Sequence, residues 1–223
     1  MDFIFMLTHN DQTVVNAAEV YETLRATSLG LVGFKDVGAS PEILERLTAA
    51  MHADGRTVFL EVVSTSAADE LRSIRAAIGV GVDYVMGGTH VDEALAAIDG
   101  APVKYCPFPG TVVGHPSELK GTIEEIADQA AEMTRRDGVH GLDLLAYRHR
   151  SVDPVALTKA VVDAAAGPVV AAGSVDSEER IRALAGAGAW AFTIGGAIFE
   201  GRLPGAPSIP GQVEWVLEVA ADA

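Results

Sequence analysis

The sequence predicts a single (β/α)8 barrel, also called a TIM barrel, over residues 1–223. Short apolar runs of the kind found in buried parallel strands alternate with amphipathic stretches along the whole chain. Each of the eight strand–helix units takes roughly 25 to 30 residues, and no change in composition marks a second domain. Such alternation predicts an all-parallel sheet, which eight units close into a barrel; an open doubly wound sheet is the alternative.

The expected strands are short and end in glycine or polar residues. They cover residues 3–7, 31–35, 57–63, 83–86, 103–106, 141–146, 168–172 and 190–194. The expected helices cover residues 14–27, 41–52, 67–78, 91–98, 123–136, 154–165, 178–185 and 210–221, with a short extra helix at 197–200. Ser40, Thr122 and Ser177 are expected to cap three of these helices, and residues 107–120 form the longest loop.

The overall composition excludes several classes of function. An apolar fraction of 49% is enough for a large core, and the net charge of −15 argues against nucleic acid or an anionic membrane as partner. Cys106 is the single cysteine, which excludes an internal disulfide. Without a signal-peptide pattern or a long apolar run, the chain is expected to be cytoplasmic. Apolar helix faces are compatible with a homodimer, although barrel helices are amphipathic in any case.

Two glycine turns lie in the last third of the chain, after the seventh and eighth expected strands. Gly173 and Ser174 form the first turn, and Gly195 and Gly196 form the second, just before the short helix. Their backbone N–H groups have little or no side chain above them, and the position after strands seven and eight is a recurrent phosphate site in such barrels. The alternative is that these residues only permit tight turns and close packing.

The segment AGSVDSEERIRALAGAGAWAFTIGGAIFEG, residues 172–201, resembles the end of the ribulose-phosphate-binding barrel superfamily. Within it, GAWAFTIGGAI is most similar to N-acetylmannosamine-6-phosphate 2-epimerase-like members. The resemblance implies phosphate binding at Gly173, Ser174, Gly195 and Gly196. It does not select the reaction, because the epimerases have a catalytic Glu where this chain has Ala172.

Two charged side chains are expected at the mouth of the barrel, where such enzymes place their catalytic groups. If Phe34 packs outward, Lys35 points into the mouth above Gly33. Lys35 could act as a base, bind an anionic oxygen or form a Schiff base; alternatively it reaches solvent or pairs with Asp36. Glu61 is a lone carboxylate in an apolar strand, and Lys35 is its expected partner, in a catalytic or a structural pair.

Four further residues are weaker candidates. Asp143, in the sixth strand, could be a second base, a hydroxyl ligand or a structural acceptor. Arg148 follows in the next loop and Gly88 ends the fourth strand, and both are candidates for binding substrate or phosphate. His9 follows the first strand and is either a general acid or base, or a solvated capping residue.

The loop over residues 107–120 is long enough to cover the barrel mouth as a lid, from which His115 could reach the substrate. His9, Glu61 and Asp143 could converge on a divalent metal ion, but no short ligand motif supports one. A dinucleotide-binding glycine pattern is missing as well. We therefore expect a site without metal or other cofactor.

These observations favour an isomerase or epimerase that acts on a small phosphorylated sugar. A base removes a proton next to a carbonyl, an acid returns one elsewhere, and Lys35, Glu61 and Asp143 divide these roles. A Schiff-base aldolase or lyase that uses Lys35 is the first alternative. A phosphate-ligand-binding regulator without catalysis is the second, but such a protein would need only the glycine turns.

Overall fold

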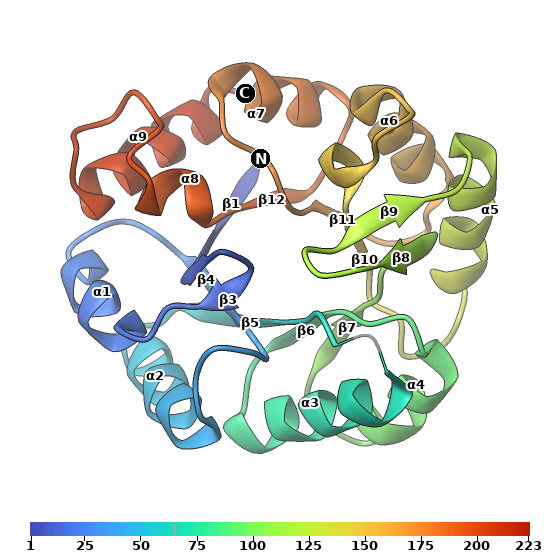
Figure 1. The fold of residues 1–223 in the computed structure, drawn as a ribbon, viewed down its shortest axis with the longest axis horizontal. Helices are drawn as coiled ribbons and strands as arrows, with labels where there is room; N and C mark the ends of the chain where they lie inside the picture. The colour runs from blue at the N-terminus through green and yellow to red at the C-terminus, as the bar shows by residue number, and fades with distance from the viewer. Residues whose placement is uncertain (65) are drawn as a thin grey trace.

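The computed structural model describes residues 1–64 and 66–223, and its main sheet is a barrel of eight parallel strands. Figure 1 shows the strands at the centre with the helices around them. The strands are β1 (Asp2–Met6), β4 (Leu31–Lys35), β5 (Thr57–Val62), β6 (Tyr84–Gly87), β7 (Lys104–Cys106), β10 (Leu142–Leu144), β11 (Val169–Ala171) and β12 (Ala191–Ile194). This arrangement confirms the barrel, and every expected strand overlaps one of them.

The sheet runs in the order β10-β11-β12-β1-β4-β5-β6-β7, so β7 and β10 are its two edges. Backbone contacts of Tyr105 and Pro107 join these edges and close the barrel. Tyr105 and Val139 form a parallel bridge, and the backbone N–H of His140 donates to the Tyr105 carbonyl at 2.8 Å. The N–H of Asp143 donates to the Pro107 carbonyl at 3.0 Å. The open-sheet alternative is therefore wrong.

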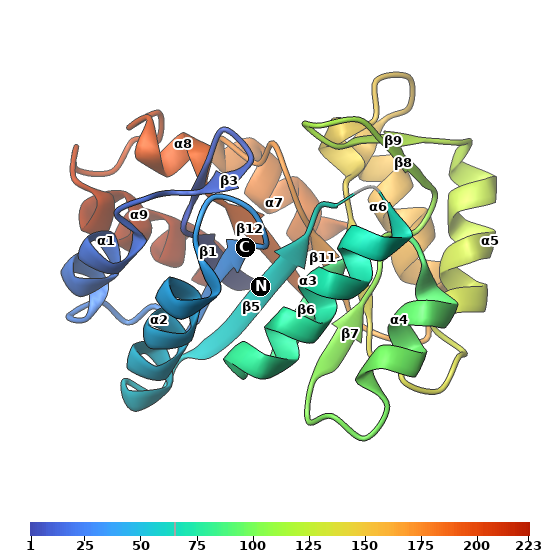
Figure 2. The same ribbon diagram turned by 60° about the horizontal axis from the view of Figure 1, so that its bottom comes forward.

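The helices pack around the outside of the barrel (Figures 1 and 2). They are α1 (Ala17–Leu24), α2 (Pro41–Ala53), α3 (Ala67–Val80), α4 (Val91–Ile98), α5 (Ile123–Met133), η1 (Ala146–Arg148), α6 (Pro154–Ala164), α7 (Glu178–Gly186), α8 (Gly196–Phe199) and α9 (Ile209–Ala221). Thr122 and Ser177 cap α5 and α7 as expected. Ser40 precedes α2, but its side chain does not bond to the helix. No helix of residues 1–64 and 66–223 is long and apolar enough to cross a membrane.

Apolar residues fill the barrel from both sides of its wall. A large cluster packs between strands and helices, and it includes Phe34, which is fully buried. A smaller cluster fills the interior, with Met6, Phe59 and Met86 among its members. Because side chains alternate along a strand, the outward position of Phe34 turns Lys35 inward, as the sequence predicts.

Two short hairpins were not expected from the sequence. Strands β2 (Thr8–His9) and β3 (Gln12–Thr13) form the first, and β8 (Thr111–Val113) and β9 (Glu118–Lys120) form the second, within the long loop predicted over residues 107–120. The first hairpin also delays the start of α1, which is shorter than predicted. Both lie on the side of the barrel where the parallel strands end (Figure 2). They therefore shape the mouth of the barrel.

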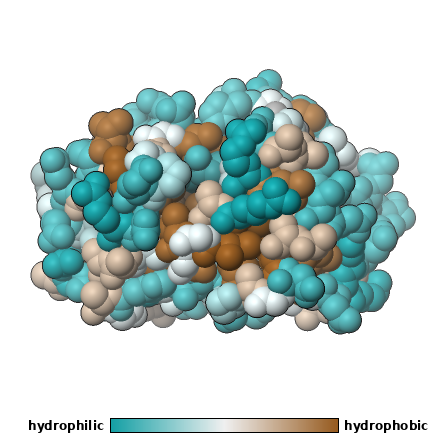
Figure 3. Space-filling model, turned by 90° about the horizontal axis from the view of Figure 1, so that it is seen from below, coloured by the Kyte–Doolittle hydropathy of each residue, from teal (hydrophilic) through white to brown (hydrophobic). Residues whose placement is uncertain are grey.

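On the outside of the barrel, a second cavity of about 450 Å³ lies between α2 and α3. Leu44, Leu60 and Ala76 belong to its apolar lining, and Asp36 and Arg72 lie among its polar residues. Apolar side chains also gather in the middle of this face in Figure 3. The cavity is separated from the barrel mouth by the wall of the sheet.

Candidate active site

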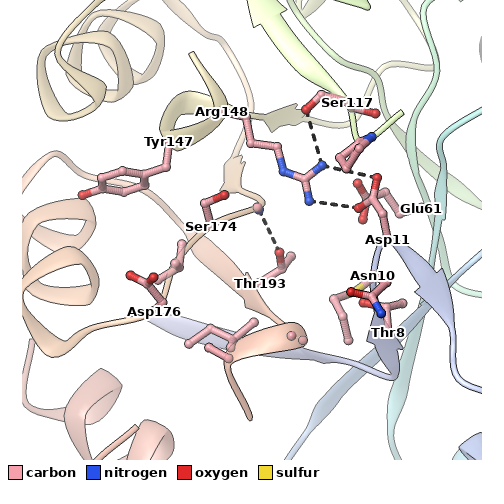
Figure 4. Close-up of a pocket in the computed structure, with 18 of the residues that line it drawn as sticks. Thr8, Asn10, Asp11, Glu61, Ser117, Tyr147, Arg148, Ser174, Asp176 and Thr193 are labelled. Carbon is pink, nitrogen blue, oxygen red and sulfur yellow. Dashed lines mark hydrogen bonds and ion pairs between the residues drawn. The ribbon is translucent and has the colours of Figure 1, made fainter. Parts of the chain in front are cut away.

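A cavity of about 570 Å³ opens at the carboxyl ends of the barrel strands (Figure 4). One part of its lining is charged and includes Lys35, Glu61 and Arg148. The other part consists of the glycine turns after β11 and β12. The same cavity thus brings two of the residues expected for catalysis, Lys35 and Glu61, together with the glycine turns expected for phosphate binding.

Lys35 is the last residue of β4, and its side chain is almost completely buried. Its Nζ lies 2.5 Å from Oδ1 of Asp11 and 3.4 Å from Oε2 of Glu61. Glu61 is next to Lys35 because the two residues are in register on neighbouring parallel strands. The structure thus shows the expected pair of Lys35 and Glu61 and adds a second carboxylate to it.

Asp11 is the central residue of this cluster, and the sequence did not single it out. Its carboxylate accepts from Lys35 and, at 2.9 Å, from Nη2 of Arg148. His115 lies farther off, with Nδ1 at 3.7 Å. Burial alone would raise the pKa of Asp11, but hydrogen bonding and the charges of Arg148 and Lys35 outweigh it, so the pKa lies well below its usual range. Asp11 is therefore an ionised carboxylate shared by two cations.

The backbone explains why Asp11 is in this position. Asn10 and Asp11 both have left-handed backbone conformations, with φ of 49° and 62°, at the tip of the β2–β3 hairpin. Asn and Asp tolerate this region better than other non-glycine residues. A polar Asn-Asp pair directly after the first strand is the one sequence signal that could have indicated the turn.

Arg148 connects the charged cluster to the first glycine turn. It ends η1, bonds to Asp11 and lies 3.4 Å from the Ser117 carbonyl (Figure 4). Its side chain crosses directly over Gly173, so that a Cβ at Gly173 would collide with Nε of Arg148. Arg148 is therefore next to the predicted phosphate turn, although its Nη groups are paired with Asp11.

The two turns present unpaired backbone donors to the cavity. Gly173 and Ser174 have φ of 77° and 58°, a succession that turns N–H groups toward one side. The N–H of Gly173 is 3.4 Å from Oγ1 of Thr193. Within residues 1–64 and 66–223, no acceptor takes the N–H of Ser174 or of Gly196. Since both residues line the cavity, these N–H groups are free to bind an anion.

Charged side chains also surround the turns. Asp176 pairs with Arg180 at 2.8 Å and with Arg202 at 3.2 Å. Arg202 also pairs with Glu200 at 2.6 Å. Both carboxylates are thus matched by an arginine where they meet the cavity.

Gly88, His9 and Asp143 are predicted site residues that lie outside the cavity lining. Gly88 packs against the carboxylate of Glu70, and its N–H donates to the Val62 carbonyl at 3.2 Å. His9 turns away from the charged cluster and bonds to Glu200 at 3.1 Å, with about a third of its side chain exposed (37%). The structure therefore does not bring Gly88 to the phosphate turns or His9 to Lys35.

Asp143 lies inside the barrel and has no exposed surface. Neither carboxylate oxygen has a hydrogen-bond partner among the described residues, which speaks against the structural acceptor among its three expected roles; second base and hydroxyl ligand stay predictions. Burial and then the charge of Glu61 raise the pKa of Asp143 well above its usual value. In the described part of the chain, no three His, Cys, Asp or Glu side chains are placed to hold a metal ion, so His9, Glu61 and Asp143 do not converge on one.

Comparison with known proteins supports the fold. No protein-family model and no curated protein sequence matches the chain. Orotidine 5'-phosphate decarboxylase from Pyrococcus horikoshii OT3 superimposes with a TM-score of 0.70 and 14% identity, over 98% of this chain and 99% of that one. N-acetylmannosamine-6-phosphate 2-epimerase from Clostridium perfringens does so with a TM-score of 0.63 and 9% identity, over 99% and 92%.

Both superpositions cover nearly the whole chain, and they agree with the barrel fold that the resemblance of segment 172–201 implies. The fold implied by that resemblance is confirmed. At these identities the likeness concerns the fold, and the reaction has to be argued from the site.

Proposed function

We propose that this chain is an enzyme that acts on a small phosphorylated sugar by moving a proton next to a carbonyl group, as isomerases and epimerases do. The proposal rests on one observation. A single cavity is lined by the glycine turns, which have free backbone N–H groups, and by the buried pair of Lys35 and Glu61. The names of both structural neighbours describe enzymes of phosphorylated compounds, which supports the phosphate part.

In this proposal the phosphate binds at the glycine turns. The N–H groups of Ser174 and Gly196 donate to its oxygens, as unpaired backbone donors do in other phosphate sites. Arg148 approaches from the side of Gly173 and contributes positive charge. A phosphate held there extends the rest of a small sugar toward the charged cluster, because both line one cavity.

The proton transfer takes place at Lys35 and Glu61. Oε2 of Glu61 lies 3.4 Å from Nζ of Lys35, and no described residue forms a hydrogen bond or ion pair with the other oxygen, which is free to accept a proton. The ammonium of Lys35 then stabilises the negative charge that develops on the carbonyl oxygen. Asp11 fixes Lys35 in this position through the shorter of its two ion pairs. Asp143 lies below the cavity lining, and we do not assign it a contact with the substrate.

Proton exchange with solvent tests this proposal directly. Ketose and aldose phosphates incubated in D2O with the protein should gain deuterium next to the carbonyl, as followed by NMR. Glu61→Gln should slow the exchange by a factor of about 10² to 10⁴, because it removes the base. Exposed Glu214→Gln on α9 is the matched control and should leave the rate unchanged. Exchange that is equally fast in Glu61→Gln would contradict the assignment of the base.

The lyase alternative requires a nucleophilic Lys35. Both of its ion pairs would have to break before the nitrogen could attack a carbonyl, which disfavours this route. Borohydride added in the presence of substrate would trap Lys35 covalently only if an imine forms. A protein that binds phosphorylated sugars but exchanges no proton and traps no imine would instead be a regulator.

A further inference from the structure

Asp143 is a buried titratable group that the proposed mechanism does not use. Its side chain has no exposed surface, and neither carboxylate oxygen has a hydrogen-bond partner among residues 1–64 and 66–223. It is in register with Val170 on β11, and its backbone N–H bonds to Pro107, directly after Cys106 at the end of β7. Val170 and Cys106 belong to the apolar interior of the barrel. These strand neighbours therefore offer no charged side chain and no hydrogen bond to the carboxylate.

The charged side chains at the cavity floor have a net charge of zero without Asp143. The cluster at the cavity floor contains two cations, Lys35 and Arg148, and two carboxylates, Asp11 and Glu61. Each cation has an ion pair with at least one of these carboxylates. An ionised Asp143 would add a third negative charge without a cation of its own, and a buried charge of that kind is strongly unfavourable.

We propose that Asp143 is a neutral carboxylic acid in the folded protein at neutral pH, a positioning residue that keeps the cluster above it electrically balanced. A cluster without net charge at the cavity floor allows an anionic ligand to enter the cavity, whereas the negative charge of an ionised Asp143 would repel it. The effect on an anionic ligand rests on the proposed function, whereas the neutral state of Asp143 does not depend on it.

The surroundings of Asp143 agree with a bound proton. Burial and the neighbouring Glu61 raise its pKa and outweigh the opposing charges of Lys35 and Arg148. Cys106 belongs to the apolar interior cluster, and burial raises the pKa of its thiol. The Cys106 thiol is therefore neutral and does not change the net charge of the cluster.

A proton on Asp143 makes stability depend on pH in a specific way. The unfolded chain releases this proton above a pKa of about 4, whereas the folded chain keeps it. Unfolding then releases one proton, and the unfolding constant rises about tenfold per pH unit until Asp143 also ionises in the folded state. Asp143→Asn has a similar shape and no proton to release, so this dependence should vanish in the variant.

Urea unfolding of the wild type and of Asp143→Asn between pH 5 and pH 7 tests the proton. The ratio of the two unfolding constants should rise about 100-fold over this range. Asp163→Asn is the control, because Asp163 is exposed and paired with Lys159 on the surface of α6, so that its ratio to wild type should stay nearly constant. A constant ratio for Asp143→Asn would show an ionised Asp143 and overturn the proposal.

Two further measurements cover the remaining cases. If Asp143→Asn does not fold, NMR of wild-type protein with 13C-labelled aspartate should show one carboxyl carbon still protonated at pH 7, and its absence would overturn the proposal.

Calorimetry with inorganic phosphate at pH 7 should give wild type and Asp143→Asn the same affinity. Tenfold tighter binding by the variant would show that Asp143 is charged. A bound proton with no phosphate binding by either protein would overturn the anion part and the proposed function alone.

Discussion

Asp11 shows how much of the candidate site depends on one residue. Its carboxylate holds Lys35 and Arg148 together, although Arg148 lies 137 positions further along the chain. Removal of one partner from a buried ion pair leaves the other charge uncompensated, which costs more than the pair itself contributes. Asp11 therefore determines both the stability of the barrel mouth and the position of Lys35.

At this scale we predict that Asp11→Asn lowers the free energy of unfolding by about 3 kcal/mol at pH 7. The folded pKa of Asp11 lies below its unfolded value, so its contribution is complete above about pH 4 and is lost as the pH falls further. The difference in stability between wild type and variant should therefore narrow as the pH falls from about 4 to 2, as followed by urea unfolding. A gap that does not change with pH would mean that Asp11 is not ionised in the folded state.

At the scale of elements, the turn after β12 is tightly constrained by its neighbours. A Cβ at Gly195 would lie 2.6 Å from both the carbonyl oxygen and Oγ1 of Thr8, and 3.0 Å from the Met6 carbonyl. Backbone from β1 thus packs directly against the turn. The glycine is required for this close approach as well as for any ligand.

We predict that Gly195→Ala lowers the free energy of unfolding by about 1 to 3 kcal/mol, because backbone has to move to admit the methyl group. Gly79→Ala on α3 is the control, since nothing lies within 4 Å of a Cβ there. That variant should be more stable than wild type by about 0.5 to 1 kcal/mol. Equal stability of Gly195→Ala and wild type in thermal unfolding would show that the turn is looser than described.

For the whole molecule, hydrophobic patterning was sufficient to predict the barrel. Its strands are continuous apolar runs, and Thr122 and Ser177 cap helices where the sequence places them. The hairpins at the mouth were missed because strands of two or three residues are too short to show alternation. Asp11 was missed because its position depends on two left-handed residues, and its partners Lys35 and Arg148 come from distant parts of the chain.

The barrel is least continuous where β7 meets β10. Its closure depends on the contacts of Tyr105 and Pro107 with residues 139–143, whereas β4 and β5 pair over five residues. We predict that the amides of His140 and Asp143 exchange with D2O faster than those of Val32 and Phe34 in native-state hydrogen exchange. Slower exchange at the β7–β10 edges would show that opening starts elsewhere.

The most direct test of the account is calorimetric titration of sugar phosphates and of the same sugars without phosphate. We expect only the phosphorylated forms to bind, because the glycine turns hold the phosphate. Gly196→Asp, at a position where a Cβ meets nothing closer than 3.8 Å, should abolish binding while the protein remains folded. Equal binding of both forms, or no binding of either, would contradict it. The glycine turns would then serve the packing of the barrel and not a ligand.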